Sequence, residues 1–336
     1  MTRLQKTPLI AVVLPCYNEG LAIGEVVRDF RHALPDAIVY VFDNNSSDDT
    51  AERAREAGAV VRHVREQGKG HVVRQAFALV EADIYVMADG DGTYDASLSG
   101  QMVEAVASGQ VEMVVATRQS SDTEAWRGGH VIGNRIFNLI VAGVFKRGFT
   151  DIFSGYRALS RPFVKSFPAL AGGFETETEM TVHALQLQLP FEEMPAPYRA
   201  RSKGSQSKLR TYSDGLRILG FTLRLLRHVR PMFLFTSLAA AAFFASLALG
   251  LPVLTKYVET GLVPRLPTAV VAASLMVIAT LSLVAGIVLD SVAHGQHELK
   301  RLAYLSLARF AESPWPLADV DRTPMPSSAT ARETSG

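Results

Sequence analysis

The sequence predicts an α/β domain built on a mostly parallel sheet, followed by interfacial helices and two transmembrane helices. Three observations lead to this fold class. Short apolar runs rich in β-branched residues alternate with helical stretches early in the chain, which is typical of a layered parallel sheet. Clusters of polar residues follow three of those runs. Two uncharged apolar runs occur later in the 336 residues, and each exceeds the roughly 20 residues that cross a bilayer as a helix.

The expected elements follow one another regularly along the first part of the chain. The predicted strands cover residues 9–14, 38–42, 59–64, 84–88 and 113–116. The predicted helices cover residues 23–34, 48–57, 72–81 and 98–107, with two more near 131–145 and 176–188. Ser46, Ser47 and Asp48 are residue types that cap helix N-termini, so they mark the start of the second helix. The basic segment 195–210 is predicted to be a loop.

The polar clusters lie at the carboxyl ends of predicted strands, where open α/β sheets bind their ligands. They comprise residues 15–19, 43–50 and 89–95. Asp89 and Asp91 are separated by one residue in a Gly-rich turn, so both carboxylates can face one ligand. Hard carboxylate oxygens suit a Mg²⁺ or Mn²⁺ ion that also holds a diphosphate. Each cluster alone could equally be a structural acidic turn, but the three together favour a binding site.

The two apolar runs predict membrane spans, because no charged residue occurs between Arg230 and Lys256 or within 266–289. Buried core helices are the alternative, but these are usually shorter and carry a polar face. The predicted division of the chain is an α/β domain at 1–210, an amphipathic juxtamembrane helix at 211–230, transmembrane helices at 231–255 and 266–290, a short non-cytoplasmic loop between them at 256–265, a juxtamembrane helix at 291–312 and a disordered tail at 313–336.

The distribution of charge predicts the orientation in the membrane. Lys and Arg residues flank the outer ends of both spans, whereas the connecting loop holds only Lys256, Glu259 and Arg265. Segments rich in Lys and Arg tend to stay in the cytoplasm, and the apolar run at 9–14 is too short for a signal peptide. We therefore expect a multi-pass protein of the inner (plasma) membrane with the α/β domain and both termini in the cytoplasm. The lone Cys16 fits a reducing compartment.

A basic block precedes the first span, although the net charge of the whole chain is only +1. Residues 199–230 contain nine Lys or Arg residues against one acid, Asp214. A basic block beside a bilayer favours anionic headgroups or phosphate ligands. Its position against a membrane span favours lipid over nucleic acid as the partner.

In their order and spacing, the three polar clusters resemble the nucleotide-sugar-binding domain of glycosyltransferase family 2. Further motifs resemble the polyprenyl-phosphate glycosyltransferase branch, which includes dolichol-phosphate mannosyltransferase. These motifs are Thr150-Asp151, Ser154-Gly155-Tyr156-Arg157, Tyr198-Arg199-Ala200-Arg201 and Gly204-Ser205-Gln206-Ser207-Lys208. The resemblance implies a GT-A fold, with the Asp-x-Asp metal motif of that fold at Asp89 and Asp91.

The resemblance also implies roles for individual residues. Asp89 and Asp91 would hold Mg²⁺ or Mn²⁺, and the nucleotide would contact Pro15, Tyr17, Glu19, Asp43 and Asp89. Gly68 is read as part of a tight Gly-Lys-Gly turn beside the nucleotide, with Lys69 exposed. The residues expected to face the acceptor phosphate, the donor diphosphate or the lipid are Arg118, His130, Asn134, Arg135, Arg201, Ser207 and Lys208.

The implied reaction is inverting transfer of a sugar from a nucleotide-sugar, preferably a UDP-sugar, to the phosphate of polyprenyl phosphate. A phosphate monoester with a second pKa of about 6 is anionic at neutral pH, so it needs positioning and charge neutralisation more than a general base. Arginines suit this task because a guanidinium donates two parallel hydrogen bonds. Related enzymes with two spans assemble as tetramers, which makes a homo-tetramer one expectation for this chain.

Two positions depart from the pattern of the relatives. Thr93 stands where dolichol-phosphate mannosyltransferases often carry Gln, and His130 stands where relatives often carry Arg. Glu177 is read either as ordering a helix start, since acids favour the positive end of a helix, or as a substrate contact.

Other functions fit the sequence less well. A processive polysaccharide synthase should carry a Gln-x-x-Arg-Trp motif and more spans. A sugar nucleotidyltransferase needs a Gly-rich nucleotide-binding start, which residues 15–19 do not supply. A non-catalytic membrane scaffold with a degenerate transferase domain, and a transferase acting on another lipid or glycan, remain as alternatives.

Overall fold

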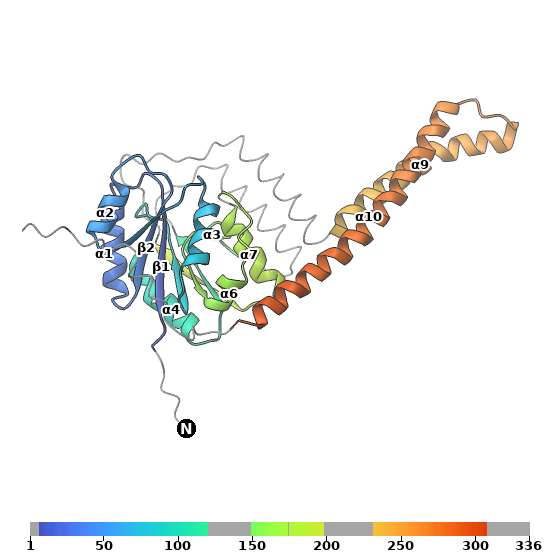
Figure 1. The fold of residues 1–336 in the computed structure, drawn as a ribbon. Coiled ribbons are helices and arrows are strands. Elements are labelled where there is room, and N and C mark those ends of the chain that lie inside the picture. Colours follow the sequence, from blue (N-terminus) through green and yellow to red (C-terminus); the bar gives the residue numbers. More distant parts are fainter. Residues whose placement is uncertain (1–6, 120–148, 174, 198–230, 308–336) are drawn as a thin grey trace, which may run out of the picture.

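The computed structural model describes residues 7–119, 149–173, 175–197 and 231–307 (Figure 1). The predicted helices at 131–145 and 211–230 and the tail at 313–336 lie outside these residues. So do six residues expected to bind phosphate or lipid: His130, Asn134, Arg135, Arg201, Ser207 and Lys208.

The described part of the chain contains one mixed, mostly parallel sheet, as the sequence predicts. Its strands are β1 (Ile10–Cys16), β2 (Ile38–Asp43), β3 (Val60–His63), β4 (Ile84–Met87), β5 (Met113–Gln119), β6 (Arg157–Ser160) and β7 (Phe191–Pro197). They lie in the order β3-β2-β1-β4-β6-β5-β7. Only β6 runs antiparallel to its neighbours, β4 and β5, while every other pair is parallel.

The last strand corrects one sequence prediction. The loop expected at 195–210 begins too early, because β7 continues through Pro197 and pairs with β5 along its length. Proline lacks a backbone N–H and is normally a signal against a strand. At the edge of a sheet, however, one side of the strand has no neighbour to bond, and β7 is an edge strand.

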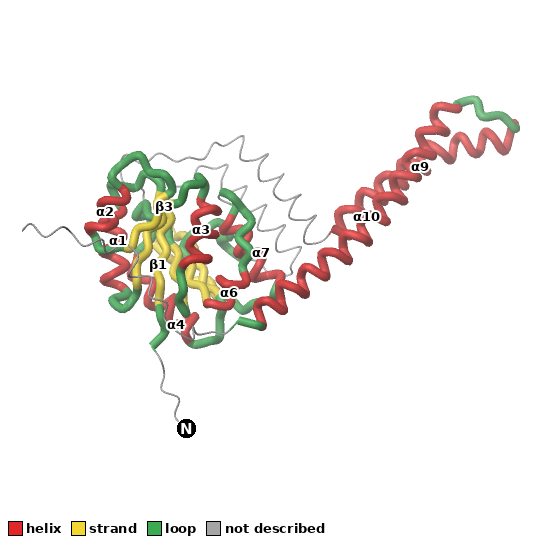
Figure 2. Tube along the Cα trace, in the orientation of Figure 1, coloured by secondary structure: helices red, strands yellow, loops and turns green. Residues whose placement is uncertain are grey.

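Helices cover both faces of the sheet, giving three layers (Figure 2). The helices are α1 (Ile23–Ala33), α2 (Thr50–Glu56), α3 (Lys69–Leu79), α4 (Ser99–Ala107), α6 (Arg161–Ser166) and α7 (Thr176–Gln186). Side chains alternate along each strand, so that in β1 Val13 joins an apolar cluster with α3, α6 and α7 while Val12 joins one with α1, α2 and α4. Burial on both faces explains why the central strands are continuous apolar runs.

Two long antiparallel helices follow, α9 (Pro231–Thr260) and α10 (Leu266–Leu305). The α9 helix continues past the expected span end at 255, where Lys256 and Glu259 form an ion pair one turn apart. The α10 helix likewise runs without interruption through the expected boundary at 290. The link between the helices is therefore shorter than the predicted loop at 256–265.

The α9–α10 pair packs through small residues and exposes large ones. The buried positions are Pro231, Ala239, Ala242 and Ser246 in α9 and Ala272, Ala279, Ser282 and Gly286 in α10. The most apolar 18-residue stretch of each helix is only 17% buried among the described residues, whereas a core helix of a soluble domain is mostly buried. Close packing of small residues with apolar side chains outward is typical of helices in membranes. Both helices are long and apolar enough to span one.

The end of α10 reaches back to the α/β domain beside α6 and α7 (Figure 1). Lys300 Nζ donates to Gln186 Oε1 at 3.1 Å, and Arg301 donates to the carbonyl of Leu187 at 2.9 Å. These two cations sit at the C-terminus of α7, where positive charge is favourable. The long helices are thus joined to the sheet domain by specific contacts as well as by the chain.

Candidate active site

Three turns meet at the carboxyl edge of β1, β2 and β4, around Cys16. Cys16 pairs with Asp43 across the parallel strands, and the N–H of Asn44 donates to its carbonyl at 2.9 Å. A Cβ placed on Gly90 would overlap the Cys16 sulfur, so the third turn also packs against this residue. Burial raises the pKa of the Cys16 thiol, and so do the surrounding carboxylates of Glu19, Asp43, Asp89 and Asp91. The acids predicted from three separate segments therefore lie around one point, and the thiol stays protonated and inert.

The turn after β1 is tied to the turn after β2 by hydrogen bonds from its backbone. These join Asn18 N to Ser46 Oγ (2.9 Å), Glu19 N to Thr50 Oγ1 (2.9 Å) and Gly20 N to Asp48 Oδ2 (3.0 Å). Asp48 is expected to start a helix, but α2 begins at Thr50. The carboxylate of Asp48 holds the N–H of Gly20 as well as that of Thr50, which makes it a link between turns.

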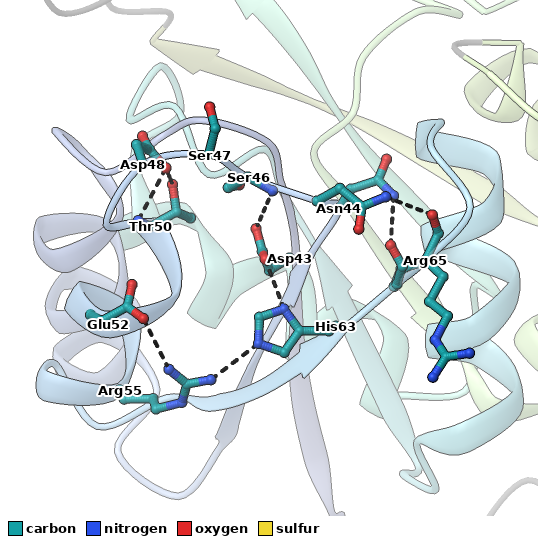
Figure 3. Close-up of polar contacts among 12 residues, drawn as sticks. Asp43, Asn44, Ser46, Ser47, Asp48, Thr50, Glu52, Arg55, His63 and Arg65 are labelled. Atoms are coloured by element: carbon teal, nitrogen blue, oxygen red, sulfur yellow. Dashed lines mark hydrogen bonds and ion pairs between the residues drawn. The ribbon is translucent and has the colours of Figure 1, made fainter.

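Asp43 is the last residue of β2, and it is held by His63, a residue that the sequence does not single out (Figure 3). His63 Nδ1 is 2.9 Å from Asp43 Oδ2, and Arg55 lies 3.2 Å from His63 Nε2. A guanidinium only donates, so Nε2 accepts and Nδ1 carries the proton given to Asp43. The backbone N–H of Ser46 donates to the other oxygen, Oδ1, at 3.2 Å. Asp43 is thus oriented from two sides while buried.

Gly68 is anchored by Asn44, the residue that follows β2 (labelled in Figure 3). The N–H of Gly68 donates to Asn44 Oδ1 at 2.7 Å, and the Asn44 amide donates to the carbonyls of Val64 and Glu66. Gly68 has φ of +136°, a backbone conformation that glycine adopts without strain. The structure therefore places Gly68 in a fixed turn at the start of α3, held to the end of β2 through Asn44.

The metal-motif carboxylates differ in their surroundings. Asp91 is buried, and its Oδ1 accepts from the N–H of Thr93 at 3.1 Å and from the Thr93 hydroxyl at 2.6 Å. Thr93 therefore orients Asp91. Asp89 is more open, with 31% of its side chain exposed, and it forms an ion pair with Lys69.

Lys69 corrects the sequence prediction that its side chain is exposed. Only 10% of the side chain is accessible, and Nζ bridges Asp89 and Glu177, the latter at 2.5 Å. Burial disfavours the ammonium, but the charges of the two carboxylates outweigh it and raise the pKa of Lys69 above its usual value. Lys69 is therefore charged, and it joins the Asp89 turn to the first turn of α7.

The segment 154–157 packs against the same cluster. The Gly155 N–H donates to the Tyr94 hydroxyl at 3.1 Å. A Cβ on Gly155 would lie 2.9 Å from Asp89 Oδ2 and 3.0 Å from Lys69 Nζ, so a side chain here would push the Asp89–Lys69 ion pair out of place. Arg157 is fully buried and donates to the Thr181 hydroxyl of α7 at 3.0 Å; its burial lowers the pKa to about 10. These contacts fix β6 and α7 around Asp89.

Arg118, expected to face the acceptor phosphate, lies at the end of β5 and is paired with Asp151. Its Nε and a terminal nitrogen donate to the two oxygens of Asp151 at 2.7 and 2.8 Å, a bidentate arrangement. Thr150 and Asp151 are held in turn by Glu193 of β7, which accepts from the Thr150 N–H at 2.8 Å. The predicted Thr150-Asp151 motif thus positions Arg118 in this structure.

The structure brings one group of predicted residues together. Pro15, Tyr17, Glu19, Asp43, Asp89 and Asp91 all belong to the turns or strand ends of the β1, β2 and β4 edge. The sequence does not single out His63, and it does not predict that Lys69 and Glu177 form a buried ion pair. Strand alignment could have identified His63. The third strand runs parallel to the second, and their ends align so that His63 pairs with Asp43.

Comparisons with known proteins agree with this geometry. Residues 11–167 match the family model described as Glycosyl transferase family 2. Glycosyltransferase AglJ of Haloferax volcanii is 32% identical over 250 residues, covering 74% of this chain and 82% of that protein. Dolichyl-phosphate hexose transferase of the same organism is 26% identical over 209 residues, covering 62% and 90%.

The fold also occurs in a solved structure. Glucosyl-3-phosphoglycerate synthase of Mycobacterium tuberculosis, in complex with Mn²⁺, UDP-glucose and phosphoglyceric acid, superposes with a TM-score of 0.52 at 23% identity. The match covers 65% of this chain and 79% of that one. At this level of identity, the likeness establishes a shared fold.

Proposed function

The chain belongs to glycosyl transferase family 2, and on that premise we propose that it transfers a sugar from a nucleotide-sugar to the phosphate of a polyprenyl phosphate. The product would be a polyprenyl-phosphate-sugar that donates to cell-envelope glycans or lipids. The observation that carries this proposal is the presence, in one chain, of a cluster of acidic side chains at one sheet edge and of two long, outwardly apolar helices. A relative named for dolichyl-phosphate hexose transfer supports the choice of a lipid phosphate as acceptor.

The nucleotide would lie along the β1–β2–β4 edge. Asp43, oriented by His63 and the N–H of Ser46, offers a fixed carboxylate to the N–H groups of a base. Pro15, Tyr17 and Glu19 would complete the nucleoside site, with Gly68 beside them. UDP is the preferred nucleotide, in line with the UDP-glucose bound by the structural neighbour.

Asp89 and Asp91 would hold the divalent cation, either Mg²⁺ or Mn²⁺. Within the described residues, no group of three or more His, Cys, Asp or Glu side chains is arranged to hold a metal. A pair of carboxylates fits an ion that completes its shell with substrate phosphates and water, as Mg²⁺ does. When bound, the ion supplies Lewis-acid stabilisation of the departing nucleoside diphosphate.

The chain's own residues position the acceptor. A phosphate oxygen of the lipid attacks the anomeric carbon, the bond from that carbon to the diphosphate oxygen breaks, and the configuration inverts. The acceptor is already anionic, so its approach requires cations rather than a base. Arg118, oriented by Asp151, is proposed for this role. His130, Asn134, Arg135, Arg201, Ser207 and Lys208 are proposed as further phosphate or lipid contacts.

We place the enzyme in the inner (plasma) membrane with the α/β domain and both termini in the cytoplasm. Cationic residues beyond the outer ends of the two predicted spans, 231–255 and 266–290, support this orientation. Lys300 and Arg301 contribute to it and also bind the end of α7. The acceptor would then enter from the bilayer. A homo-tetramer is proposed on the basis of the related enzymes.

The test uses the full-length chain in detergent or nanodiscs with a panel of labelled nucleotide-sugars. Each is offered polyprenyl phosphate, the matched polyprenol without phosphate, or 3-phosphoglycerate. The expected product is a labelled lipid that forms only with the phosphorylated lipid and disappears when EDTA is added. Turnover with phosphoglycerate or polyprenol in place of the lipid phosphate would overturn the proposed acceptor. Nucleotide-sugar binding without any turnover would favour the non-catalytic scaffold.

A further inference from the structure

The Gly-Lys-Gly turn at the start of α3 has a structural purpose beyond its flexibility. A Cβ on either Gly68 or Gly70 would overlap the backbone carbonyls of residues 171 and 172. The two glycines therefore let the loop before α7 lie directly against the start of α3. That approach carries Lys69 between the Asp89 turn and α7, away from solvent.

The position of the Lys69 ammonium is unfavourable unless negative charges lie beside it. It is the first residue of α3, where the helix dipole disfavours a cation, and its side chain is almost fully buried. Burying an ammonium is costly without paired anions. Asp89 and Glu177 supply those anions, so Lys69 is already the cation bound to the first carboxylate of the metal motif.

Glu177 has an unused oxygen beside this ammonium. Its Oε1 accepts from Lys69, whereas its buried Oε2 has no hydrogen-bond partner among the described residues. A buried carboxylate oxygen without a partner is costly and rare in folded proteins. It offers Lys69 a second contact within reach, one that Lys69 could gain on leaving Asp89.

We propose that Lys69 is a resident counter-ion that occupies Asp89 until the divalent cation arrives, and that loading of the metal displaces Lys69 from Asp89 onto both oxygens of Glu177. Gly155 leaves room for the exchange, because a Cβ at this position would lie 2.9 Å from Asp89 Oδ2 and 3.0 Å from Lys69 Nζ. Asp89 is thereby paired with a cation between turnovers. A divalent cation must compete with Lys69 for the Asp89 carboxylate. This inference rests on the proposed metal site at Asp89 and Asp91.

The experiment measures Mn²⁺ binding to the full-length chain in detergent, by the electron paramagnetic resonance signal of free Mn²⁺. Lys69→Met keeps the length of the side chain and removes the competing charge. We expect it to bind Mn²⁺ about tenfold more tightly than the wild type, a change in the usual range of coupling between two sites. Lys165→Met is the matched control. Lys165 is also buried, but it pairs with Glu81, beyond the opposite end of α3 from Lys69. The Mn²⁺ affinity of Lys165→Met should equal that of the wild type.

Two further measurements keep the inference falsifiable. The gain from Lys69→Met should persist when salt rises from about 0.1 M to about 1 M, because buried contacts are screened much less than exposed charges. Glu177→Gln should weaken Mn²⁺ binding, since it removes the anion to which Lys69 moves. A melting temperature close to that of the wild type confirms that each variant is folded.

The outcomes separate this inference from the proposed function. Unchanged or weaker Mn²⁺ binding by folded Lys69→Met, with normal binding by the wild type, would overturn the counter-ion role and leave the transferase intact. If the wild type binds Mn²⁺ no better than Asp91→Asn does, with or without UDP, the proposed metal site itself fails.

Discussion

The two ends of the acidic edge hold their carboxylates in different ways. At the proposed nucleoside end, Asp43 is held by a histidine N–H and a backbone N–H. At the proposed diphosphate end, Asp89 is held by the ammonium of Lys69. A network of hydrogen bonds with fixed geometry can read the edge of a base without rearranging. An ion pair can instead be exchanged for another cation.

This difference suggests a division of roles along the acidic edge, with donor binding at one end and the rate of transfer at the other. Variants at the nucleoside end should alter how tightly the donor binds, whereas variants at the diphosphate end should alter the rate of transfer. This expectation follows from transition-state theory, since only interactions that strengthen in the transition state raise the rate constant. In the proposed reaction, negative charge develops on the leaving diphosphate at the second end.

The largest effect is expected for Asp91→Asn. Removing one ligand charge from the proposed metal site should lower kcat by about 10³-fold, the upper part of the range for losing a stabiliser of developing charge. Steady-state transfer assays with saturating donor measure this. Asp95→Asn is the control, because Asp95 lies in the same turn but caps the short helix through the Ser97 N–H. Equal losses in both variants would show that the turn, rather than the carboxylate, is responsible.

Asp43→Asn should produce the complementary result. Loss of the charge that faces the base should weaken binding of the nucleoside diphosphate about tenfold or more, as for hydrogen bonds to charged groups, and leave kcat at saturation nearly unchanged. Calorimetric titration with UDP measures the affinity, and Asp36→Asn, on the exposed turn before β2, provides the control. A fall in kcat with unchanged affinity would break the division between the two ends.

The sequence predicts the layered sheet and the acidic edge because both depend on local signals. Apolar runs mark β1, β2 and β4, and the polar turns after them must share one edge of a parallel sheet. The roles of Lys69 and His63 depend on contacts between distant segments. Lys69 becomes buried only because the loop near residue 171 packs on Gly70, and His63 reaches Asp43 only through the register of β2 and β3.

The antiparallel β6 and the edge strand β7 were missed for a related reason. The run Arg157–Ser160 is short and begins with a charged residue, which in a sequence resembles a loop. In the structure, Arg157 donates to the carbonyls of Ser154 and Ile152 as well as to Thr181. A buried arginine becomes acceptable when all of these acceptors surround it, and none of them can be assigned from the sequence alone.

Gly155→Ala tests the proposed diphosphate end by adding a methyl group beside Asp89 without changing any charge. The added methyl would lie within 3.0 Å of both Asp89 Oδ2 and Lys69 Nζ, so the ion pair must shift. We expect kcat to fall about tenfold, since a small misplacement of a catalytic group can cost that much or more, while UDP affinity stays within about twofold of the wild type. Gly24→Ala is the control, because its Cβ would meet nothing closer than 3.7 Å.

The smallest effect is expected for His63→Ala, which removes the donor to Asp43 Oδ2 and leaves the Ser46 N–H in place. A hydrogen bond of this kind contributes about 1 kcal/mol net, so UDP affinity should fall about fivefold with kcat unchanged. His63 is 59% exposed, and this exposure keeps the loss small, because water can replace the imidazole. His32→Ala, on the exposed face of α1, should have no effect on either quantity. A fall in kcat for His63→Ala would mean that the two ends are coupled, and Asp43 would then have to be assigned to the same exchangeable cluster as Asp89.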